Sequence, residues 1–360
     1  MTSKRTAADF KDHHDPLEML AKQAKQLATA EKELGLQRAI AATVGASLKD
    51  TESYAPPAWV VKPPKGQEGA PGVPTLFLSD IHAGEVVQPS QVSGVNSYNL
   101  TILRQRMKHT ITTAVHLCSI LDSKMRYPGI VVPLGGDMVS GDIHEELVAT
   151  NELPTIPVVL ELYEYLTQAI VTLLEHFPAV FLPCVSGNHG RNTKKMWAKN
   201  RNHTSFDWLL YQILAKRFQN EPRVTFYVPA ASDALYRVYN VRYLLTHGDQ
   251  FRGGDGIIGP LGPIFRGTQK KLARNQAVGQ DFEVAIMGHW HQYIHTERVI
   301  VNGSMKGYDE YAAQSNFGFE PPRQALWITH PRYGINWRMP VLCEAPAPMG
   351  GKVDWVSIAK

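Results

Sequence analysis

The sequence has few cysteines and no paired-cysteine motif. Three occur in 360 residues, Cys118, Cys184 and Cys343, and no two of them form a C-x-x-C pair. Widely separated single cysteines fit reduced thiols in a reducing compartment better than a disulfide framework. A small disulfide-stapled scaffold is therefore excluded, and we expect the three thiols to pack as small hydrophobic groups.

Long apolar runs are also missing. The chain contains no stretch of about 18 apolar residues, which argues against a membrane span, and its charged N-terminus lacks the apolar segment of a secretory signal. Charge of one sign is scarce as well, because 37 basic and 33 acidic residues leave a net charge of +4. We expect a soluble, cytoplasmic protein that binds anionic partners only where its basic residues cluster.

The beginning of the chain differs in pattern from the rest. From 16 to 36 apolar residues recur at steps of three and four, the period of an amphipathic helix, and a second short helix follows from 37 to 48. Residues 54–73 are rich in proline and glycine, which marks a linker. We therefore expect four parts: a helical N-terminal segment (1–53), the linker (54–73), a main domain (74–345) and a C-terminal tail (346–360). The N-terminal helices would pack on the main domain or bind a protein partner, with packing the favoured role.

In the main domain, short apolar runs alternate with helical patterns. Helices are predicted at 99–122 and 155–177, and a further one after Ser205. Strands that alternate with helices indicate an α/β domain. The second half is richer in strands, with hairpins predicted around Asn240 and across 330–334.

Five of the apolar runs end in residues of the kinds that bind metals. They read Asp80-Ile81-His82, Gly136-Asp137, Gly187-Asn188-His189, His247-Gly248 and Gly288-His289-Trp290-His291. Open α/β sheets place ligand sites at the carboxyl ends of their strands, and adjacent glycines let the backbone come close to an ion. One such residue alone is most often a turn or a helix cap. Five together indicate a shared metal site.

These motifs resemble those of the calcineurin-like metallophosphoesterase superfamily, which run D-x-H, G-D, G-N-H, H and G-H-x-H in this order. The resemblance spans about residues 74–341 and implies a four-layer αββα sandwich of two mixed sheets with helices outside. It makes Asp80, His82 and His291 ligands of one metal, and Asn188, His247 and His289 ligands of a second. Asp137 would bridge the two metals, and His189 would be the catalytic histidine. Asp80-Ile81-His82-Ala83-Gly84 also resembles the D-x-H-x-G opening of the DNA-repair nuclease branch.

The ligand types agree with that assignment. Imidazoles mixed with carboxylate and amide groups suit Mn, Fe, Zn or Ni, whereas Mg or Ca would favour oxygen ligands throughout. We expect two divalent transition-metal ions, with Mn preferred. A pair of such ions can hold a bridging hydroxide as the nucleophile, while the ions and a protonated His189 stabilise the charge that develops during in-line attack on phosphorus.

One departure from the family pattern concerns His189. Many members continue G-N-H with an acidic residue, but Gly190 stands here, so a carboxylate that could orient the imidazole is missing from that position. We expect Asp142, Asp249 or another acid to replace it, although both named residues are more often ordinary loop acids.

A basic segment follows the third motif directly. From Arg191 to Arg201 the chain carries five positive charges, no acid and one aromatic residue, Trp197. Such a segment can neutralise phosphates and stack on bases, although a solvated basic loop would have the same composition. The candidate substrate-binding residues are Arg191, Lys194, Lys195 and Trp197.

A second basic cluster follows His247 at a greater distance. It consists of Arg266, Lys270, Lys271 and Arg274, after a glycine-rich stretch from Gly253 to Gly267. We expect this stretch to be a mobile lid or substrate rim, since no G-K-[ST] phosphate loop is present.

The sequence thus favours a metal-dependent nuclease, with nucleic acid as its partner. One alternative is a phosphatase or phosphodiesterase for a small nucleotide or a phosphoprotein. Another is a nucleic-acid-binding scaffold with little turnover.

Overall fold

The computed structural model describes residues 25, 27, 31, 56–63, 71–252 and 259–345. The chain divides into two compact units, Met1–Ala55 and Pro56–Lys360. In the first unit Lys25, Leu27 and Glu31 are helical, as predicted for 16–36. The rest of that helix, the helix predicted at 37–48 and the tail at 346–360 lie outside the described residues.

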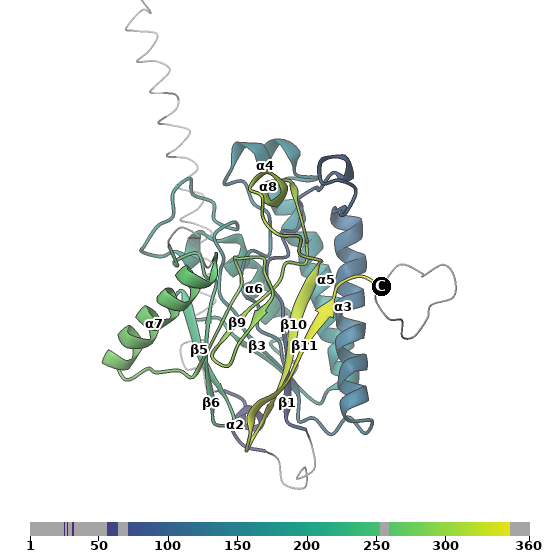
Figure 1. The fold of residues 1–360 in the computed structure, drawn as a ribbon, viewed down its shortest axis with the longest axis vertical. Helices are drawn as coiled ribbons and strands as arrows, with labels where there is room; N and C mark the ends of the chain where they lie inside the picture. Colours follow the sequence, from purple (N-terminus) through teal and green to yellow (C-terminus); the bar gives the residue numbers. More distant parts are fainter. Residues whose placement is uncertain are drawn as a thin grey trace, which may run out of the picture. The chain divides into compact units, whose positions relative to one another are not determined.

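In the described part of the second unit, the strands form two mixed sheets (Figure 1). The first has the order β11 (Gly334–Leu342), β10 (Arg323–His330), β1 (Val73–Phe77), β2 (Ile130–Val131), β3 (Val180–Pro183) and β4 (Val224–Tyr227). The second has the order β5 (Asp233–Val238), β6 (Val241–Thr246), β7 (Val284–Met287), β9 (Val299–Val301) and β8 (Ile294–His295). Strands β1 to β4 are parallel, as are β6, β7 and β9, while β10, β11, β5 and β8 supply the antiparallel pairings.

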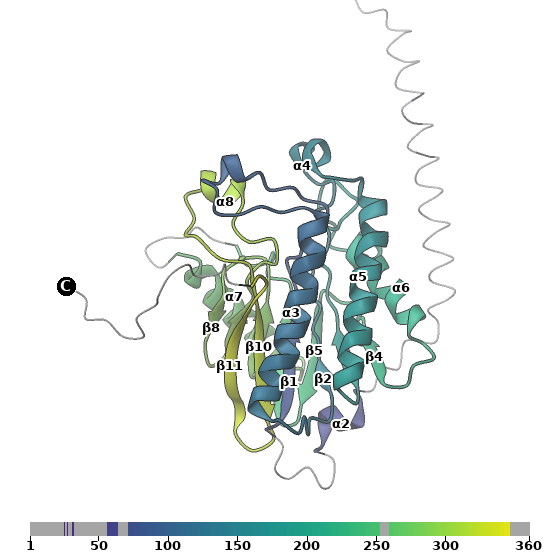
Figure 2. The same ribbon diagram turned by 90° about the vertical axis from the view of Figure 1, so that its right-hand side faces the viewer.

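Helices cover the outer faces of both sheets. In Figures 1 and 2, α3 (Leu100–Leu121) and α5 (Thr155–His176) lie side by side on the six-stranded sheet, and α7 (Leu261–Ala277) lies on the other side of the molecule, by β5 and β6. The remaining helices are α2 (Ala58–Val61), α4 (Glu145–Thr150), α6 (Phe206–Arg217), α8 (Glu310–Gln314) and two 3-10 turns, Pro89–Gln91 and Asn202–Thr204. The predicted fold class, an αββα sandwich of two mixed sheets, is confirmed.

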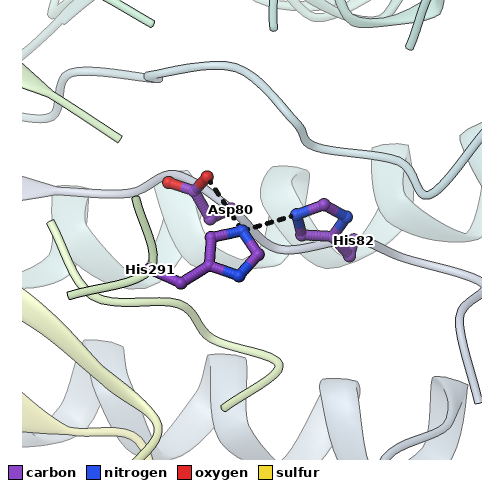
Figure 3. A group of neighbouring side chains, drawn as sticks. All are labelled: Asp80, His82 and His291. Carbon is purple, nitrogen blue, oxygen red and sulfur yellow. Dashed lines mark hydrogen bonds and ion pairs between the residues drawn. The ribbon is translucent and has the colours of Figure 1, made fainter. Parts of the chain in front are cut away.

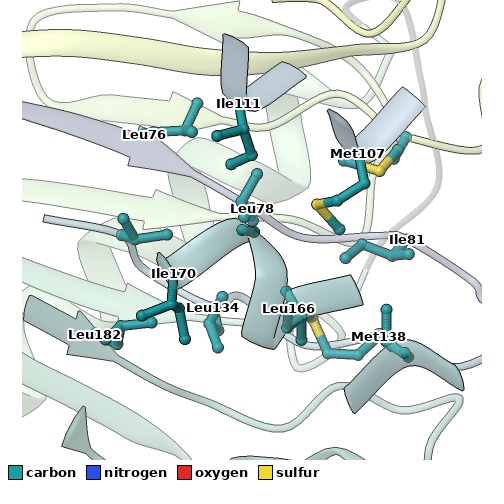
Figure 4. Packing of buried hydrophobic residues seen from close by; sticks show 14 of the residues in the cluster. Leu76, Leu78, Ile81, Met107, Ile111, Leu134, Met138, Leu166, Ile170 and Leu182 are labelled. Atoms are coloured by element: carbon teal, nitrogen blue, oxygen red, sulfur yellow. The ribbon is translucent and has the colours of Figure 1, made fainter. Parts of the chain in front are cut away.

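Apolar periodicity explains where the long helices pack. Leu103, Met107 and Ile111 form one buried stripe on α3, and the side chain of Asn99 caps the helix by accepting a hydrogen bond from the Ile102 amide at 2.9 Å. Figure 4 shows this stripe against side chains of β1 and of α5. Each buried Leu, Ile or Met side chain contributes about 1.5 to 3 kcal/mol to folding, so the stripe fixes the helix on the sheet.

Helix α5 is long and apolar enough to cross a membrane by length and composition alone. Its buried residues, among them Val158, Leu162, Leu166 and Leu173, instead belong to the core cluster beneath the six-stranded sheet. This burial is the arrangement of a core helix in an α/β domain.

Aromatic side chains join the two sheets. The Tyr243 hydroxyl on β6 lies 2.7 Å from the Thr329 hydroxyl on β10 and accepts a hydrogen bond from the Trp327 indole at 3.2 Å. Phe181 of β3 meets Tyr236 of β5 edge to face, with ring centroids 5.9 Å apart. These contacts fix the spacing of the sheets.

Two sequence expectations need correction. The predicted linker, 54–73, contains helix α2, whose Val60 is buried and accepts a hydrogen bond from the Tyr239 amide at 2.7 Å. Of the predicted mobile loop from Gly253 to Gly267, residues 253–258 lie outside the described residues, and helix α7 begins at Leu261, because Ile264 packs in the core of the five-stranded sheet. The prediction for the thiols is confirmed, since all three cysteines are free and buried.

A buried arginine ties α3 to the loop that follows β9. Arg106 is 2% exposed and donates to the carbonyl oxygens of Met305, Lys306 and Ser97, and to Asn96 Oδ1. Its Nε donates to Glu344 at 2.7 Å. One guanidinium thus satisfies several acceptors that would otherwise be buried without partners.

We expect Arg106→Met to lower the free energy of unfolding by about 3 kcal/mol, because it leaves buried acceptors unpaired. Arg104→Met is the matched control, since Arg104 is exposed on the same helix. Urea denaturation measures both. Equal stability of the two variants would contradict the role given to Arg106.

Candidate metal centre

The predicted ligands lie on loops that leave the carboxyl ends of strands in both sheets. In the six-stranded sheet, the loop after β1 carries Asp80 and His82, the loop after β2 carries Asp137, and the loop after β3 carries Asn188. In the five-stranded sheet, the loop after β6 carries His247, and the loop after β7 carries His289 and His291. Parallel bridges between Leu78 and Leu134, and between Leu134 and Cys184, continue the pairing of the first three strands toward these loops. All seven side chains therefore meet at one edge.

The first cluster consists of Asp80, His82 and His291, whose ligand atoms all lie within 4.8 Å of one another. His82 Nε2 is 3.0 Å from His291 Nε2, and His291 Nε2 is 3.4 Å from Asp80 Oδ1 (Figure 3). Asp80 and His82 are buried, and His291 is half-buried. The three side chains point to a common position.

The second cluster consists of Asp137, His247 and His289, within the same 4.8 Å limit. His247 Nε2 lies 3.0 Å from Asp137 Oδ2 and 3.1 Å from Asn188 Oδ1. Asn188 therefore joins this cluster through its amide oxygen, as its place in the sequence predicts.

Asp137 lies between the two clusters. Its Oδ2 is 3.0 Å from His247 Nε2 in the second and 4.0 Å from His82 Nε2 in the first. The His189 amide donates to its other oxygen, Oδ1, at 2.7 Å. Asp137 would therefore be the ligand that two ions share, as the resemblance implies.

The backbone is left-handed at five of the seven ligands. The φ angles are 52° at Asp80, 49° at His82, 51° at Asp137, 69° at His289 and 53° at His291. Non-glycine residues adopt this region rarely and at some energetic cost, and they concentrate at functional sites. The local strain turns the side chains of successive motif residues toward one centre.

Two glycines make room for the buried carboxylates. A Cβ atom on Gly187 would lie 2.0 Å from Asp137 Oδ1, and one on Gly288 would lie 2.1 Å from Asp80 Oδ2. Any side chain at either position would displace the carboxylate. The glycines of the third and fifth motifs are therefore required by close approach.

The electrostatics of the centre favour a positive charge. Burial alone would lower the pKa of His247, but the carboxylates of Asp137, Asp80 and Asp249 raise it to about 10. Burial would likewise raise the pKa of Asp137, yet the surrounding imidazoles, His247 first, lower it well below the usual value. A cation placed between these carboxylates would be stabilised in the same way.

The donor set fits divalent transition metals. Imidazole nitrogens, carboxylate oxygens and one amide oxygen converge in two groups, and such mixed sets suit Mn, Fe, Zn or Ni. Hydrogen bonds also orient the ligands, since His247 Nδ1 lies 2.8 Å from the Gly135 carbonyl oxygen and the His289 amide donates to Asp80 Oδ1 at 2.8 Å. Outer contacts of this kind are typical of metal-binding histidines.

His189 borders both clusters without joining either. Its ring lies edge to face with His82 at a centroid distance of 4.6 Å, and its Nδ1 is 3.0 Å from the Ser140 carbonyl oxygen. Burial lowers its pKa, although Asp137 opposes the shift. The Ser140 carbonyl thus orients the imidazole and leaves Nε2 available.

The acids expected to orient His189 do not do so. Asp142 accepts a hydrogen bond from Thr155 Oγ1 at 2.7 Å, and Asp249 pairs with Arg201 at 3.0 Å. A backbone carbonyl takes their expected role, and sequence patterns give no signal for such a contact.

A buried ionic network that the motifs did not reveal supports His82. Glu85 Oε2 lies 3.5 Å from His82 Nδ1, and Glu85 Oε1 is 2.7 Å from the Lys306 ammonium, which also pairs with Asp309. Burial would lower the pKa of Lys306, but these two carboxylates raise it above its ordinary value. Lys306 and Asp309 are both buried within this network.

The loop after β9 supports Asp80 from behind. Ser79 Oγ donates to Asp80 Oδ2 at 2.5 Å, and Asn302 Nδ2 donates to Ser79 Oγ at 2.9 Å. Gln324 Oε1 accepts from both the Ser79 amide and Asn302 Nδ2. Asn302 therefore has a structural role in holding the first cluster.

The candidate substrate-binding residues divide into two groups. Arg191 is half-buried and donates to the carbonyl oxygens of Asn188 and Thr193, so its guanidinium is partly used inside the protein. Lys194 and Lys195 are exposed, and Trp197 is 50% exposed. A small pocket next to the second cluster is lined by Gly187, Asn188, Arg191, Thr193, Met196, Trp197, Arg201, Thr204 and Ser205.

The second basic cluster is only partly a surface feature. Lys271 is buried and pairs with Asp233 at 2.7 Å, and Arg274 pairs with the same carboxylate at 2.8 Å. Arg266 and Lys270 are exposed. Lys271 is thus held inside the protein, whereas Arg274 is exposed although it pairs with Asp233.

Two further histidines, His144 and His295, contact aromatic rings. The His144 ring is 6.0 Å from the His189 ring, at the start of α4. The His295 ring packs edge to face on Trp327 at 6.1 Å, away from the clusters.

Comparison with known proteins gives fold neighbours only. No family model and no curated protein matches the sequence. One similar solved structure is a predicted phosphoesterase from Streptococcus pneumoniae, which is 12% identical with a TM-score of 0.27 and covers 71% of this chain and 82% of that one. Another is a single mutant of Vps29 from Entamoeba histolytica, which is 12% identical with a TM-score of 0.28 and covers 74% of this chain and 99% of that one. A putative 5'-nucleotidase from Staphylococcus aureus is 11% identical with a TM-score of 0.28 and covers 79% of this chain and 56% of that one. TM-scores this low cannot support an assignment.

The assignment depends instead on the chain's own residues. Five motifs follow one another in the expected order, at the strand ends of two mixed sheets, and their side chains form two adjoining ligand clusters. The chain resembles the calcineurin-like metallophosphoesterases. Its centre contains two adjoining groups of metal-ligand types, as that resemblance implies.

We expect the protein to bind two Mn²⁺ ions per chain, and Asp137→Ala to weaken both by more than about 10-fold, because Asp137 lies between the clusters. Titration calorimetry and the rise in melting temperature with added Mn²⁺ measure this binding. Asp142→Ala, which removes a nearby exposed acid, is the control. Unchanged Mn²⁺ uptake by Asp137→Ala would exclude the shared-ligand role.

Proposed function

We propose that this chain is a dinuclear, Mn²⁺-dependent phosphodiesterase that cleaves nucleic acid. The observation that carries the proposal is the exposed basic segment beside the second ligand cluster. Its residues Lys194, Lys195 and Lys199 are exposed, and the pocket that it borders includes the metal-ligand candidate Asn188. A polymer of phosphates bound along this segment would pass next to the metal centre.

The chemistry of the pocket supports a substrate with bases as well as phosphates. Trp197 and Met196 are 50% and 44% exposed, and Arg191 and Arg201 line the same pocket. Aromatic rings stack on unpaired bases regardless of their sequence, and guanidinium groups pair with phosphate. The combination favours single-stranded or locally opened nucleic acid.

The residues of the centre have separable roles in hydrolysis. Two bound cations would act as Lewis acids on the phosphoryl group and lower the pKa of a water molecule. Asp80 and Asp137 supply the negative charge that holds the cations, and the imidazoles complete their coordination. Gly187 and Gly288 keep the carboxylates close to the backbone.

His189 is the proposed catalytic group. Its Nδ1 faces the Ser140 carbonyl, so Nε2 is the atom that would hold or transfer a proton at the leaving-group oxygen. Burial keeps the imidazole neutral in the chain by itself, since its pKa is lowered. A phosphate beside the ring would raise the pKa again through its negative charge.

A small nucleotide is the second candidate substrate. The pocket beside Asn188 has a volume of only about 10 Å³, so a nucleotide would lie over its rim, where the Trp197 ring is exposed and Arg191 is half-buried. A nucleotide would need fewer of the exposed lysines than a polymer, so the two candidates differ in their dependence on the basic segment.

The proposal predicts cleavage of diesters and polymers by the Mn²⁺-loaded protein. Single-stranded DNA, double-stranded DNA, RNA, bis-p-nitrophenyl phosphate, p-nitrophenyl phosphate and a nucleoside 5'-monophosphate would be compared, with Asp137→Ala as the inactive control. Turnover of monoesters with intact polymers would replace the nuclease by a phosphatase or nucleotidase. Polymer binding without any turnover would indicate a scaffold.

The basic segment has its own test. Changing Lys194, Lys195 and Lys199 to Glu should weaken polymer binding at least 10-fold and flatten its salt dependence, because phosphate contacts release counterions. Hydrolysis of bis-p-nitrophenyl phosphate should stay within about twofold. Changing Lys108, Lys124 and Lys216, exposed elsewhere on the surface, is the matched control. Equal loss on both substrates would exclude a polymer-specific role.

A further inference from the structure

Asp207 is a buried acid that the mechanism above does not use. It lies in the first turn of α6 and is fully buried. Its Oδ2 accepts hydrogen bonds from the Asp137 amide at 3.0 Å and the Gly187 amide at 2.9 Å, and its Oδ1 accepts from the Met138 amide at 3.2 Å. One carboxylate thus joins the loop of the second motif to the loop of the third.

Those two loops carry ligands of the second cluster. The amide of Asp137 itself is one donor, and Gly187 directly precedes Asn188. Burial, followed by the nearby charge of Asp137, raises the pKa of Asp207 to about 6. Burying a second acid this close to Asp137 costs free energy, which the three backbone hydrogen bonds to Asp207 offset.

The space around Gly190 indicates the role of Asp207. A Cβ on Gly190 would lie 2.7 Å from Asp207 Oδ1, 2.9 Å from Asp207 Cγ and 3.2 Å from the Asp207 amide nitrogen. These nearest atoms all belong to Asp207, and Gly190 is not among the residues with positive φ. A glutamate at this position would place its carboxyl carbon about 2.5 Å from Cβ, which is close to where the Asp207 carboxyl carbon lies.

We propose that Asp207 is a positioning residue of the metal centre: from α6 it places a carboxylate in the space beside Gly190, where it accepts hydrogen bonds from the backbone N–H groups of Asp137, Met138 and Gly187. It holds the Asp137 and Asn188 loops at the separation that the second ion requires. The proposal rests on the proposed function only through the metal centre and is independent of the substrate.

The first test is Asp207→Asn, which keeps the shape of the side chain but turns an NH₂ group toward backbone N–H donors. Titration of the full chain with MnCl₂ should show binding weakened about 10- to 100-fold at the second site, as for other residues that support metal ligands. The rise in melting temperature on Mn²⁺ addition should shrink accordingly.

Asp122→Asn is the matched control. Asp122 is also buried and also accepts hydrogen bonds from backbone amides, those of Arg126 at 2.9 Å and Lys124 at 3.3 Å. It is the C-cap residue of α3 and belongs to neither ligand cluster. This variant should lower the melting temperature without changing Mn²⁺ affinity. The comparison separates positioning of the centre from general stability.

The second test moves the acid. Gly190→Glu alone should disrupt Mn²⁺ binding by collision with Asp207, and Asp207→Ala alone should weaken it by loss of the carboxylate. Together the two changes should recover Mn²⁺ affinity to within about 10-fold of the wild type. Relief of the collision alone could restore no more than the affinity of Asp207→Ala, so binding tighter than that of Asp207→Ala shows that the carboxylate at position 190 replaces the one lost at position 207.

The outcomes separate this proposal from the preceding one. Wild-type protein that binds no Mn²⁺ would overturn the metal centre itself. Wild-type binding that Asp207→Asn leaves unchanged would overturn only the role of Asp207. If Asp207→Ala is insoluble, a double variant that is also insoluble, or no better at binding Mn²⁺, would overturn it as well.

Discussion

The burial of two carboxylates, Asp80 and Asp137, is the constraint on which this structure depends. Asp80 and Asp137 are at most 1% exposed, and each is stabilised by a backbone N–H donor and by imidazoles from other loops. A buried charge is tolerated only when it is paired and hydrogen-bonded. Five ligands adopt a left-handed backbone, which turns their side chains toward the centre. Gly187 and Gly288 leave the space that the two carboxylates occupy, where any side chain would collide with them. The two buried carboxylates thus form a site that a cation would neutralise.

The same constraint explains why two sheets are needed. Asp80, Asp137 and Asn188 come from the six-stranded sheet, while His247, His289 and His291 come from the five-stranded sheet. Neither sheet contains a complete cluster, so the ligands converge only when the sheets pack. Tyr243, Trp327 and Thr329 set that packing through hydrogen bonds between β6 and β10. A change that weakens the packing of the two sheets would therefore also displace the ligands from one another.

Sequence reasoning succeeds where the signal is local or periodic. The stripe on α3 and the apolar pattern of α5 predict those helices to within one residue at each end, and the strand-end motifs predict the ligands that the fold brings together. It fails where the partner is distant and unremarkable in type. Asp207 resembles an acid that favours the start of a helix, and its partner Asp137 lies 70 residues earlier. Lys271 reads as a surface charge until the fold brings it to Asp233, 38 residues away. The role of the Ser140 carbonyl leaves no trace in residue type at all.

Charge also separates affinity from turnover in the proposed enzyme. Burial would lower the pKa of His247, but the carboxylates of Asp137, Asp80 and Asp249 raise it to about 10, and these carboxylates would repel a phosphate in the absence of cations. The exposed lysines of the basic segment lie on the protein surface, where no acid within residues 191–201 offsets them. Attraction of a polyanion would then depend on the basic segment and on ionic strength, whereas its correct placement over the centre would depend on the bound ions. Bound metal ions would therefore be needed both to place the substrate correctly and to hydrolyse it. Without the ions, the protein would hold nucleic acid on the basic segment, while the carboxylates of the centre would exclude the scissile phosphate.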